Sequence, residues 1–171
     1  ADTYDVPAIF LDNWYDYGPA ITIEMFQQFQ NKAESEVAKK NQFMIIGPGT
    51  HCDFKENTEN FIVGERDLGN ASLDYSEIQL RWFDYWLKGD KSALTSMPKV
   101  QYFLMGKNEW RSSEVWPLEK TKWRRWNLGS EGNAQTRLVN GRLSSDPLGS
   151  ASADSFRYDP SDPVPSLGGH T

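Results

Sequence analysis

Asp16 and His51 are the two residues whose types and positions best suit acid–base chemistry. Asp16 ends the polar loop 12–16, and His51 lies in the loop 47–53. Each loop follows a short apolar run that predicts a buried strand. Neighbouring parallel strands lie about 4.8 Å apart, and their carboxyl ends share one edge of the sheet. We therefore expect the carboxylate and the imidazole to meet, although they are distant in the sequence.

A carboxylate that accepts a hydrogen bond from imidazole Nδ1–H fixes the tautomer of the ring and leaves Nε2 free as a general base. This pairing predicts a catalytic role for Asp16 and His51. The competing interpretation is a surface or structural histidine, which is the more frequent use of a lone His in a loop. His170, near the end of a segment rich in Pro and Gly, is interpreted as structural or incidental.

The run His51-Cys52-Asp53 invites two further interpretations, a metal site and a cysteine nucleophile. Adjacent residues in a loop rarely converge on one ion, and the spacings C-x₂-C and H-x₃-H are absent from the sequence. We therefore expect no metal and no other cofactor. We also reject Cys52 as a nucleophile, because the side chains of immediate neighbours seldom face each other.

A serine nucleophile is missing from the sequence. In α/β-hydrolases the triad follows the order Ser, Asp, His, and the serine lies in a G-x-S-x-G turn between a strand and a helix. No serine here has Gly at both flanking second positions, and only eleven residues precede Asp12. We therefore expect this chain to be inactive alone and to depend on a serine from upstream sequence.

The elements that position these loops follow a strand–helix–strand pattern. Residues 6–11 and 42–47 predict strands buried on both faces, and Pro19 can open a helix that runs to about Lys40. The buried stripe of that helix is expected at three positions four residues apart: Ile21, Met25 and Phe29. Short loops between these elements indicate a right-handed parallel crossover, and hence an α/β sheet.

A further helix is expected over residues 73–88, with Ser72 as N-cap and Gly89 as the stop. It carries more large apolar side chains than one narrow stripe holds: Ile78, Leu80, Trp82, Phe83, Trp86 and Leu87. We therefore expect it to be buried on more than one side.

After Lys91 the sequence changes to short β-type runs separated by turns. The runs lie at 100–105, 122–128, 136–139 and 155–158. Asn140-Gly141 is the strongest hairpin signal in the chain. This pattern predicts a β-sandwich, and so a division into domains 1–92 and 93–171.

Composition excludes several classes of protein. With 38% hydrophobic and 13% aromatic residues, the 171-residue chain is expected to fold. Its net charge of −6 argues against nucleic acid as a partner, and no apolar run is long enough to span a bilayer, so we expect no membrane partner. A single Cys excludes an internal disulfide. The sequence does not indicate a compartment.

Several sequence blocks, in this order, span nearly the whole chain: 6–9, 13–16, 46–51, 80–89, 105–111 and 159–169. Together they resemble the family that includes X-prolyl dipeptidyl-peptidases, α-amino-acid ester hydrolases, glutaryl acylases and cocaine-esterase-type serine hydrolases. The resemblance implies the end of an α/β-hydrolase domain in residues 1–92 and the first part of a jelly-roll β-sandwich in residues 93–171. Only the C-terminal portion of such an enzyme would be present.

The resemblance also implies that Asp16 is the triad acid and His51 the triad base. The serine and the oxyanion hole would lie in the N-terminal part of the same enzyme, which thereby becomes an expected partner. The implied substrate is a small ester, amide or peptide. Gly168-Gly169 suggests a close approach of backbone, at a domain seam or beside the acyl pocket. The alternative function is a non-catalytic β-sandwich module that binds a glycan or a protein.

Overall fold

The computed structural model describes residues 4–54, 59–136, 140–149, 153–164 and 167–168. The chain forms two compact units. The first comprises residues 1–119 together with 166–171, and the second comprises residues 120–165. The domain change expected at about residue 92 stays a prediction, and the two compact units divide the chain after residue 119.

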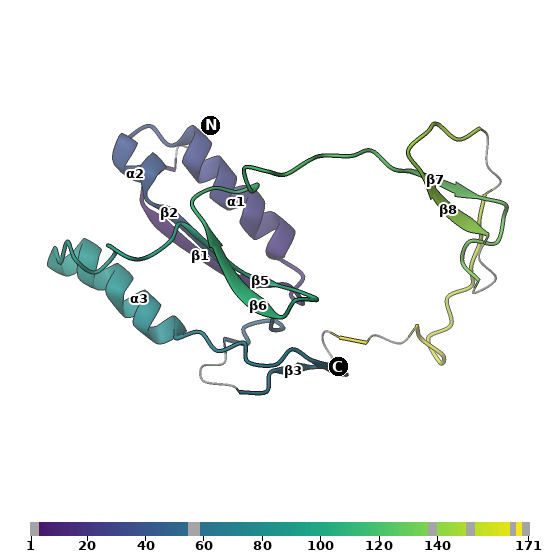
Figure 1. The fold of residues 1–171 in the computed structure, drawn as a ribbon, viewed down its shortest axis with the longest axis horizontal. Coiled ribbons are helices and arrows are strands. Elements are labelled where there is room, and N and C mark those ends of the chain that lie inside the picture. The colour runs from purple at the N-terminus through teal and green to yellow at the C-terminus, as the bar shows by residue number, and fades with distance from the viewer. Residues whose placement is uncertain (1–3, 55–58, 137–139, 150–152, 165–166, 169–171) are drawn as a thin grey trace. The chain divides into compact units, whose positions relative to one another are not determined.

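A four-stranded mixed sheet organises the first unit, in the order β1-β2-β5-β6 (Figure 1). β2 (Gln42–Gly47) pairs in parallel with β1 (Ala8–Asn13) on one side and with β5 (Val100–Leu104) on the other. Every residue of β2 is buried, which confirms the strand expected there. β1 lies at the edge of the sheet and only its last two residues are fully buried, but both of its faces are covered in part. Phe10 packs against the cluster that contains Phe26, and Ile9 and Leu11 pack against the cluster on the other face.

β6 (Glu109–Ser113) completes this sheet as the antiparallel neighbour of β5. The strand expected at 100–105 is confirmed, but it pairs with β2 and not with other strands of a separate sandwich. The alternation of turns and short runs in this part of the sequence identified β5 without revealing its partners, because partner choice depends on contacts distant in the sequence.

Two helices, α1 (Pro19–Lys32) and α2 (Glu36–Lys40), stand where a single helix was expected. Pro19 does open the first of them. The interruption has a local cause. The Ser35 hydroxyl accepts a hydrogen bond from the Ala38 N–H (3.1 Å) and starts α2, while the Asp5 carboxylate accepts from the Ser35 N–H (2.7 Å). These capping bonds replace helical bonds and divide the segment.

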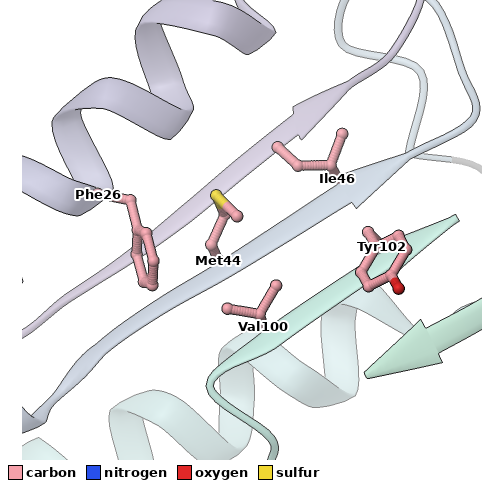
Figure 2. Packing of buried hydrophobic residues seen from close by; sticks show 5 residues of the cluster. All are labelled: Phe26, Met44, Ile46, Val100 and Tyr102. Carbon is pink, nitrogen blue, oxygen red and sulfur yellow. The ribbon is translucent and has the colours of Figure 1, made fainter. Parts of the chain in front are cut away.

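α1 packs on one face of the sheet through Phe26, which is fully buried. Figure 2 shows its ring directed toward side chains of the two central strands: Met44, Ile46, Val100 and Tyr102. Ile21 and Met25, which were expected in the buried stripe, are 63% and 44% exposed, so that expectation was wrong. Phe26, and not Ile21 or Met25, is the side chain that the helix buries against the sheet. Phe29 lies partly buried against Phe10.

α3 (Tyr75–Phe83) covers the opposite face of the sheet (Figure 1), through Tyr75 and Ile78, which cluster with Ile45 of β2. It begins at Asp74, whose carboxylate accepts a hydrogen bond from the Glu77 N–H (2.8 Å). Ser72, two residues earlier, is therefore not the N-cap that the sequence suggested.

A π-helical turn (Asp84–Lys88) continues α3 and ends at Gly89, whose φ of 76° places it in the left-handed region. The expected stop is confirmed. The expectation of burial on several sides was wrong, because the buried residues Tyr75, Ile78 and Trp82 lie on one face. Large side chains on the remaining surface are exposed, namely Leu80, Phe83 and Leu87.

The segment between β2 and α3 contains a short antiparallel pair, β3 (Ile62–Val63) and β4 (Arg66–Asp67). Its apolar residues join a buried cluster that reaches β5: Phe61, Val63, Leu68, Ala71 and Phe103. Sequence periodicity gave no assignment here, because the order of this segment comes from burial against a distant strand.

In the second unit the described residues form an antiparallel pair, β7 (Asn127–Ser130) and β8 (Gly141–Ser144). β7 overlaps only the end of the strand expected at 122–128. Residues 155–158, also expected as a strand, have no regular structure.

The hairpin expected at Asn140-Gly141 involves residues 137–139, which lie outside the described residues. The pairing that the structure describes joins β8 to β7. Among the described residues, no helix is long and apolar enough to cross a membrane.

The packing of α1 predicts different costs for two neighbouring substitutions. Phe26→Ala should lower the free energy of unfolding by about 3–5 kcal/mol, because it leaves a cavity in the core. Met25→Ala, on the exposed side of the same helix turn, should cost less than about 1 kcal/mol. Urea unfolding of both variants measures the difference. Equal losses would show that the helix does not present Phe26 to the sheet.

Candidate active site

The candidate site lies where β1 and β2 end. The two strands are in parallel register up to Asn13 and Gly47, so their carboxyl ends reach the same level. Backbone hydrogen bonds continue the pairing into the loops: Trp14 N–H donates to the Gly47 carbonyl (2.8 Å), and Tyr15 N–H donates to the Gly49 carbonyl (3.1 Å). The two loops therefore leave the sheet side by side.

The side chain of Asn13 joins the two loops. It is fully buried, and its Oδ1 accepts a hydrogen bond from the Gly49 N–H (3.1 Å). Its Nδ2 donates to the carbonyl oxygens of Thr50 (3.0 Å) and Asp53 (3.4 Å). Both ends of one amide are thus used to hold the loop that carries His51. The role of Asn13 was not predicted from the sequence, although a polar residue at the last position of a buried strand indicates a buried hydrogen-bonding group.

Two glycines make room for this amide. A Cβ at Gly47 would collide with Asn13 Oδ1 and with the Tyr75 hydroxyl. A Cβ at Gly49 would lie 2.5 Å from the Asp53 carbonyl oxygen. Larger residues at either position would force the loop away from Asn13, so the glycines are needed for close approach.

The other loop is anchored by Asp12, which is buried. Its Oδ1 accepts a hydrogen bond from the Asn13 N–H (2.7 Å), and its Oδ2 accepts from the Thr22 hydroxyl (2.5 Å) in the first turn of α1. A Cβ at Gly18 would lie 3.1 Å from Oδ2 of the same carboxylate. Strand end, loop and helix start are thereby fixed together, with Asp16 between them.

The expected meeting of Asp16 and His51 is present. His51 Nδ1 lies 2.9 Å from Asp16 Oδ2, and the side chains are 44% and 10% exposed respectively. The second oxygen of the carboxylate, Oδ1, accepts a hydrogen bond from the Tyr17 N–H (2.6 Å). A shielded acid thus contacts a base whose ring is open to solvent. The catalytic roles of the two residues stay a prediction.

The electrostatics of Asp16 favour its ionised form. Desolvation raises its pKa, but the hydrogen bond from His51 and those from the Tyr17 and Gly18 N–H groups outweigh this effect, so the pKa lies below its usual range. A carboxyl with a lowered pKa stabilises the fold above its unfolded-state pKa and loses that contribution as the pH falls through the folded-state value. At neutral pH the ionised Asp16 is therefore available to accept a hydrogen bond from His51 Nδ1–H.

Two side chains lie near the other ring nitrogen of His51. The Tyr17 hydroxyl is 3.4 Å from Nε2, and the rings are 4.9 Å apart between centroids at an angle of 30°. The Cys52 Sγ is 3.5 Å from Nε2. Cys52 has a φ of 56°, in the left-handed region, and its side chain faces that of His51, contrary to the expectation for neighbours.

Asp53 does not join His51 and Cys52 as a metal ligand set, since no group of three or more His, Cys, Asp or Glu suited to a metal ion occurs in the described part of the chain. Tyr17 also contacts His51, and the spacing of the two residues in the sequence did not indicate this contact. The contact arises from the turn of the loop after Asp16.

The segment at residues 167–168 also approaches this region within the first unit. The Leu167 carbonyl accepts a hydrogen bond from the Glu65 N–H (3.1 Å). A Cβ at Gly168 would lie 2.8 Å from the Tyr15 hydroxyl, so the close approach expected for this glycine is confirmed. Gly169 and His170 lie outside the described residues.

The sequence is similar to a domain family and to several proteins named as esterases. Residues 92–165 match the family described as the X-Pro dipeptidyl-peptidase C-terminal non-catalytic domain. Over 167 residues, 95% of the chain, the sequence is 33% identical to the cocaine esterase of Rhodococcus sp. (strain MB1 Bresler). It is 32% identical over 86 residues, half of the chain, to putative serine esterases of Mycobacterium bovis and Mycobacterium tuberculosis.

The fold is similar to that of a solved aminopeptidase from a marine sediment archaeon, Thaumarchaeota archaeon, with a TM-score of 0.61 and 18% identity over 95% of the chain. The chain spans 27% of the length of the cocaine esterase, 13% of each putative serine esterase and 24% of the aminopeptidase chain. The described sheets, with few helices, fit a β-rich C-terminal part of such proteins.

The bridging role of Asn13 can be tested by hydrogen exchange. In Asn13→Ala the Gly49 N–H loses its acceptor, and the free energy of unfolding should fall by about 2 kcal/mol or more because buried polar groups are left unpaired. The Gly49 amide should exchange faster than in the wild type. Asn70→Ala is the matched control, since Asn70 is exposed and its side chain accepts a hydrogen bond from the nearby Ser72 N–H. Unchanged exchange at Gly49 in Asn13→Ala would refute the bridge.

Proposed function

Because the chain corresponds to the C-terminal portion of the family of cocaine-esterase-type hydrolases and X-Pro dipeptidyl-peptidases, we propose that it supplies the acid and the base of a Ser–His–Asp hydrolase. Asp16 is the acid and His51 is the base. The nucleophilic serine comes from the N-terminal part of the same enzyme, and the enzyme cleaves ester or amide bonds of small ester, amide or peptide substrates.

The contact between His51 Nδ1 and Asp16 Oδ2, at 2.9 Å, carries this proposal. It leaves Nε2 free of the carboxylate on the more exposed residue of the pair, and in this proposal a serine hydroxyl from other polypeptide binds there. The loops meet at the carboxyl ends of parallel strands, which is where reactive groups collect in open α/β sheets. The relatives bear the names of esterases and an aminopeptidase, which supports acyl transfer as the reaction class.

The mechanism has two acyl-transfer steps. The serine Oγ attacks the carbonyl carbon of the substrate while His51 Nε2 takes the hydroxyl proton. His51 then returns that proton to the leaving alcohol or amine, and an acyl-enzyme remains. Water attacks the acyl-enzyme, gives its proton to the same Nε2, and the acid product leaves as the proton returns to serine. Asp16 stays ionised throughout and stabilises the imidazolium.

In this proposal the mixed sheet is the end of an α/β-hydrolase domain. Its parallel strands β1, β2 and β5, with α1 on one face and α3 on the other, support that origin. The antiparallel pair β7–β8 supports the start of a jelly-roll sandwich in the second unit. β5 and β6 then extend the hydrolase sheet although they lie within residues 92–165, which match the C-terminal domain family, so the proposed domain boundary stays at about residue 92.

A second candidate function concerns residues 92–165 alone. Their match to a domain described as non-catalytic favours a binding or interaction role for this part of the chain. Within the second unit, a hollow of about 520 Å³ lies beside β7 and β8, with Leu128, Leu143 and Asp154 among its lining residues. This role is compatible with catalysis by Asp16 and His51, which lie outside the matched range.

The catalytic assignment predicts large losses of turnover in the full-length hydrolase that contains these residues. His51→Ala should remove most of the activity, and Asp16→Asn should lower kcat by about 10⁴-fold, because the wrong tautomer is favoured. Hydrolysis of a chromogenic ester measures both. His170→Ala, which changes the other histidine of the chain, is the control and should leave the rate nearly unchanged.

Labelling with a serine-directed phosphonate separates the roles of the two parts. This chain alone should not react, whereas the full-length hydrolase should. Near-normal ester hydrolysis in either His51→Ala or Asp16→Asn would eliminate the triad assignment and leave the binding role as the better account.

A further inference from the structure

We infer that Tyr17 is a positioning residue for the imidazole of His51. This inference rests on the proposed function for its consequence in catalysis, but the contacts that carry it do not. One residue touches both ends of the Asp–His pair: its backbone holds the carboxylate, and its side chain lies against the imidazole.

Three contacts define this arrangement. The Tyr17 N–H donates to Asp16 Oδ1 (2.6 Å), which leaves Oδ2 for His51 Nδ1 (2.9 Å). The Tyr17 hydroxyl lies 3.4 Å from His51 Nε2. The phenol and imidazole rings are in contact, 4.9 Å apart between centroids and tilted by 30°.

The exposure of Tyr17 argues against a role in core packing. Its side chain is 81% exposed, and it belongs to none of the buried clusters formed by the described residues. Tyr15, two residues earlier, packs instead against the cluster that contains Phe61 and Phe103. The principal side-chain contact of Tyr17 is therefore His51, a ring that is itself 44% exposed and otherwise contacts Asp16 and Cys52.

The chemistry of the contacts favours one state of the ring. Asp16 accepts a hydrogen bond from Nδ1–H, so it favours the Nδ1–H tautomer, which is the tautomer that a general base at Nε2 needs. In that tautomer Nε2 is unprotonated and can accept a hydrogen bond from the Tyr17 hydroxyl. The phenol ring beside the imidazole opposes rotation of the imidazole away from Asp16.

The contact between the Tyr17 hydroxyl and His51 Nε2 is long enough for another hydroxyl to replace it. At 3.4 Å it is weaker than the bond that a serine hydroxyl would make to the same Nε2. Tyr17 would thus hold the imidazole in orientation and yield the Nε2 position to the nucleophile. Removing the ring should affect the proton-transfer step, and so kcat, more than it affects substrate affinity.

Reaction with diethylpyrocarbonate, which acylates unprotonated imidazole nitrogen, tests the contact in this chain without any catalysis. In Tyr17→Ala the rate of modification at His51 should rise about fivefold, because an aromatic contact of about 1 kcal/mol no longer shields the ring. Tyr17→Phe keeps the aromatic contact and should stay within about twofold of the wild type. Peptide mass spectrometry follows His51, with His170 as the internal reference.

Two controls keep the result specific. Tyr158→Ala removes another exposed tyrosine and should not change the rate at His51. Thermal unfolding should give the same midpoint for Tyr17→Ala and the wild type within a few degrees, since Tyr17 packs in no buried cluster. A rate at His51 that is equal in Tyr17→Ala and wild type would overturn the inference.

The full-length hydrolase tests the consequence for catalysis. Tyr17→Ala should lower kcat by about tenfold with a smaller change in KM, and Tyr17→Phe should restore most of the loss. A change in KM alone would refute the positioning role and make Tyr17 a substrate contact. If His51→Ala remains active while Tyr17→Ala still accelerates the modification of His51, the proposed function fails but the contact inference stands.

Discussion

The parallel register of β1 and β2 is the constraint on which the site depends. It brings Asn13 and Gly47 to the same level, and the buried Asn13 amide then ties the loop after β2 to the end of β1. Without that pairing, a carboxylate and an imidazole separated by 35 residues would have no reason to meet. The glycines at 47 and 49 serve the same constraint, because a side chain at either position would displace the loop from the amide.

The exposed fraction of the polar side chains at the site increases from the strand end toward His51. Asn13 is fully buried and Asp12 nearly so, Asp16 is 10% exposed, and His51 is 44% exposed. The buried amide and carboxylate anchor backbone, whereas the imidazole is the most exposed group of the set. Such a gradient suits a base that must exchange protons with a group from other polypeptide, since its partner acid stays shielded while its own ring remains reachable.

Sequence reasoning was most successful where short-range patterns decide the structure. The buried strand β2, the helix start at Pro19 and the stop at Gly89 follow from local burial and from backbone preferences. It failed where partners lie far apart in the sequence. The choice of Phe26 as the buried position of α1 depends on the sheet face it meets, and the pairing of β5 with β2 depends on a contact across more than fifty residues. The contact of Asp16 with His51 could be predicted because parallel strands share their carboxyl ends.

The central claim is that the Nδ1–H of His51 is bound by Asp16. Proton NMR of the ¹⁵N-labelled chain tests it directly, because an imidazole N–H held by a carboxylate exchanges slowly and resonates far downfield. One such resonance is expected, attached to Nδ1 of His51, and it should disappear when the Asp16 carboxylate is removed. A wild-type spectrum in which His51 carries its proton on Nε2, or a resonance that survives loss of the carboxylate, would contradict the account.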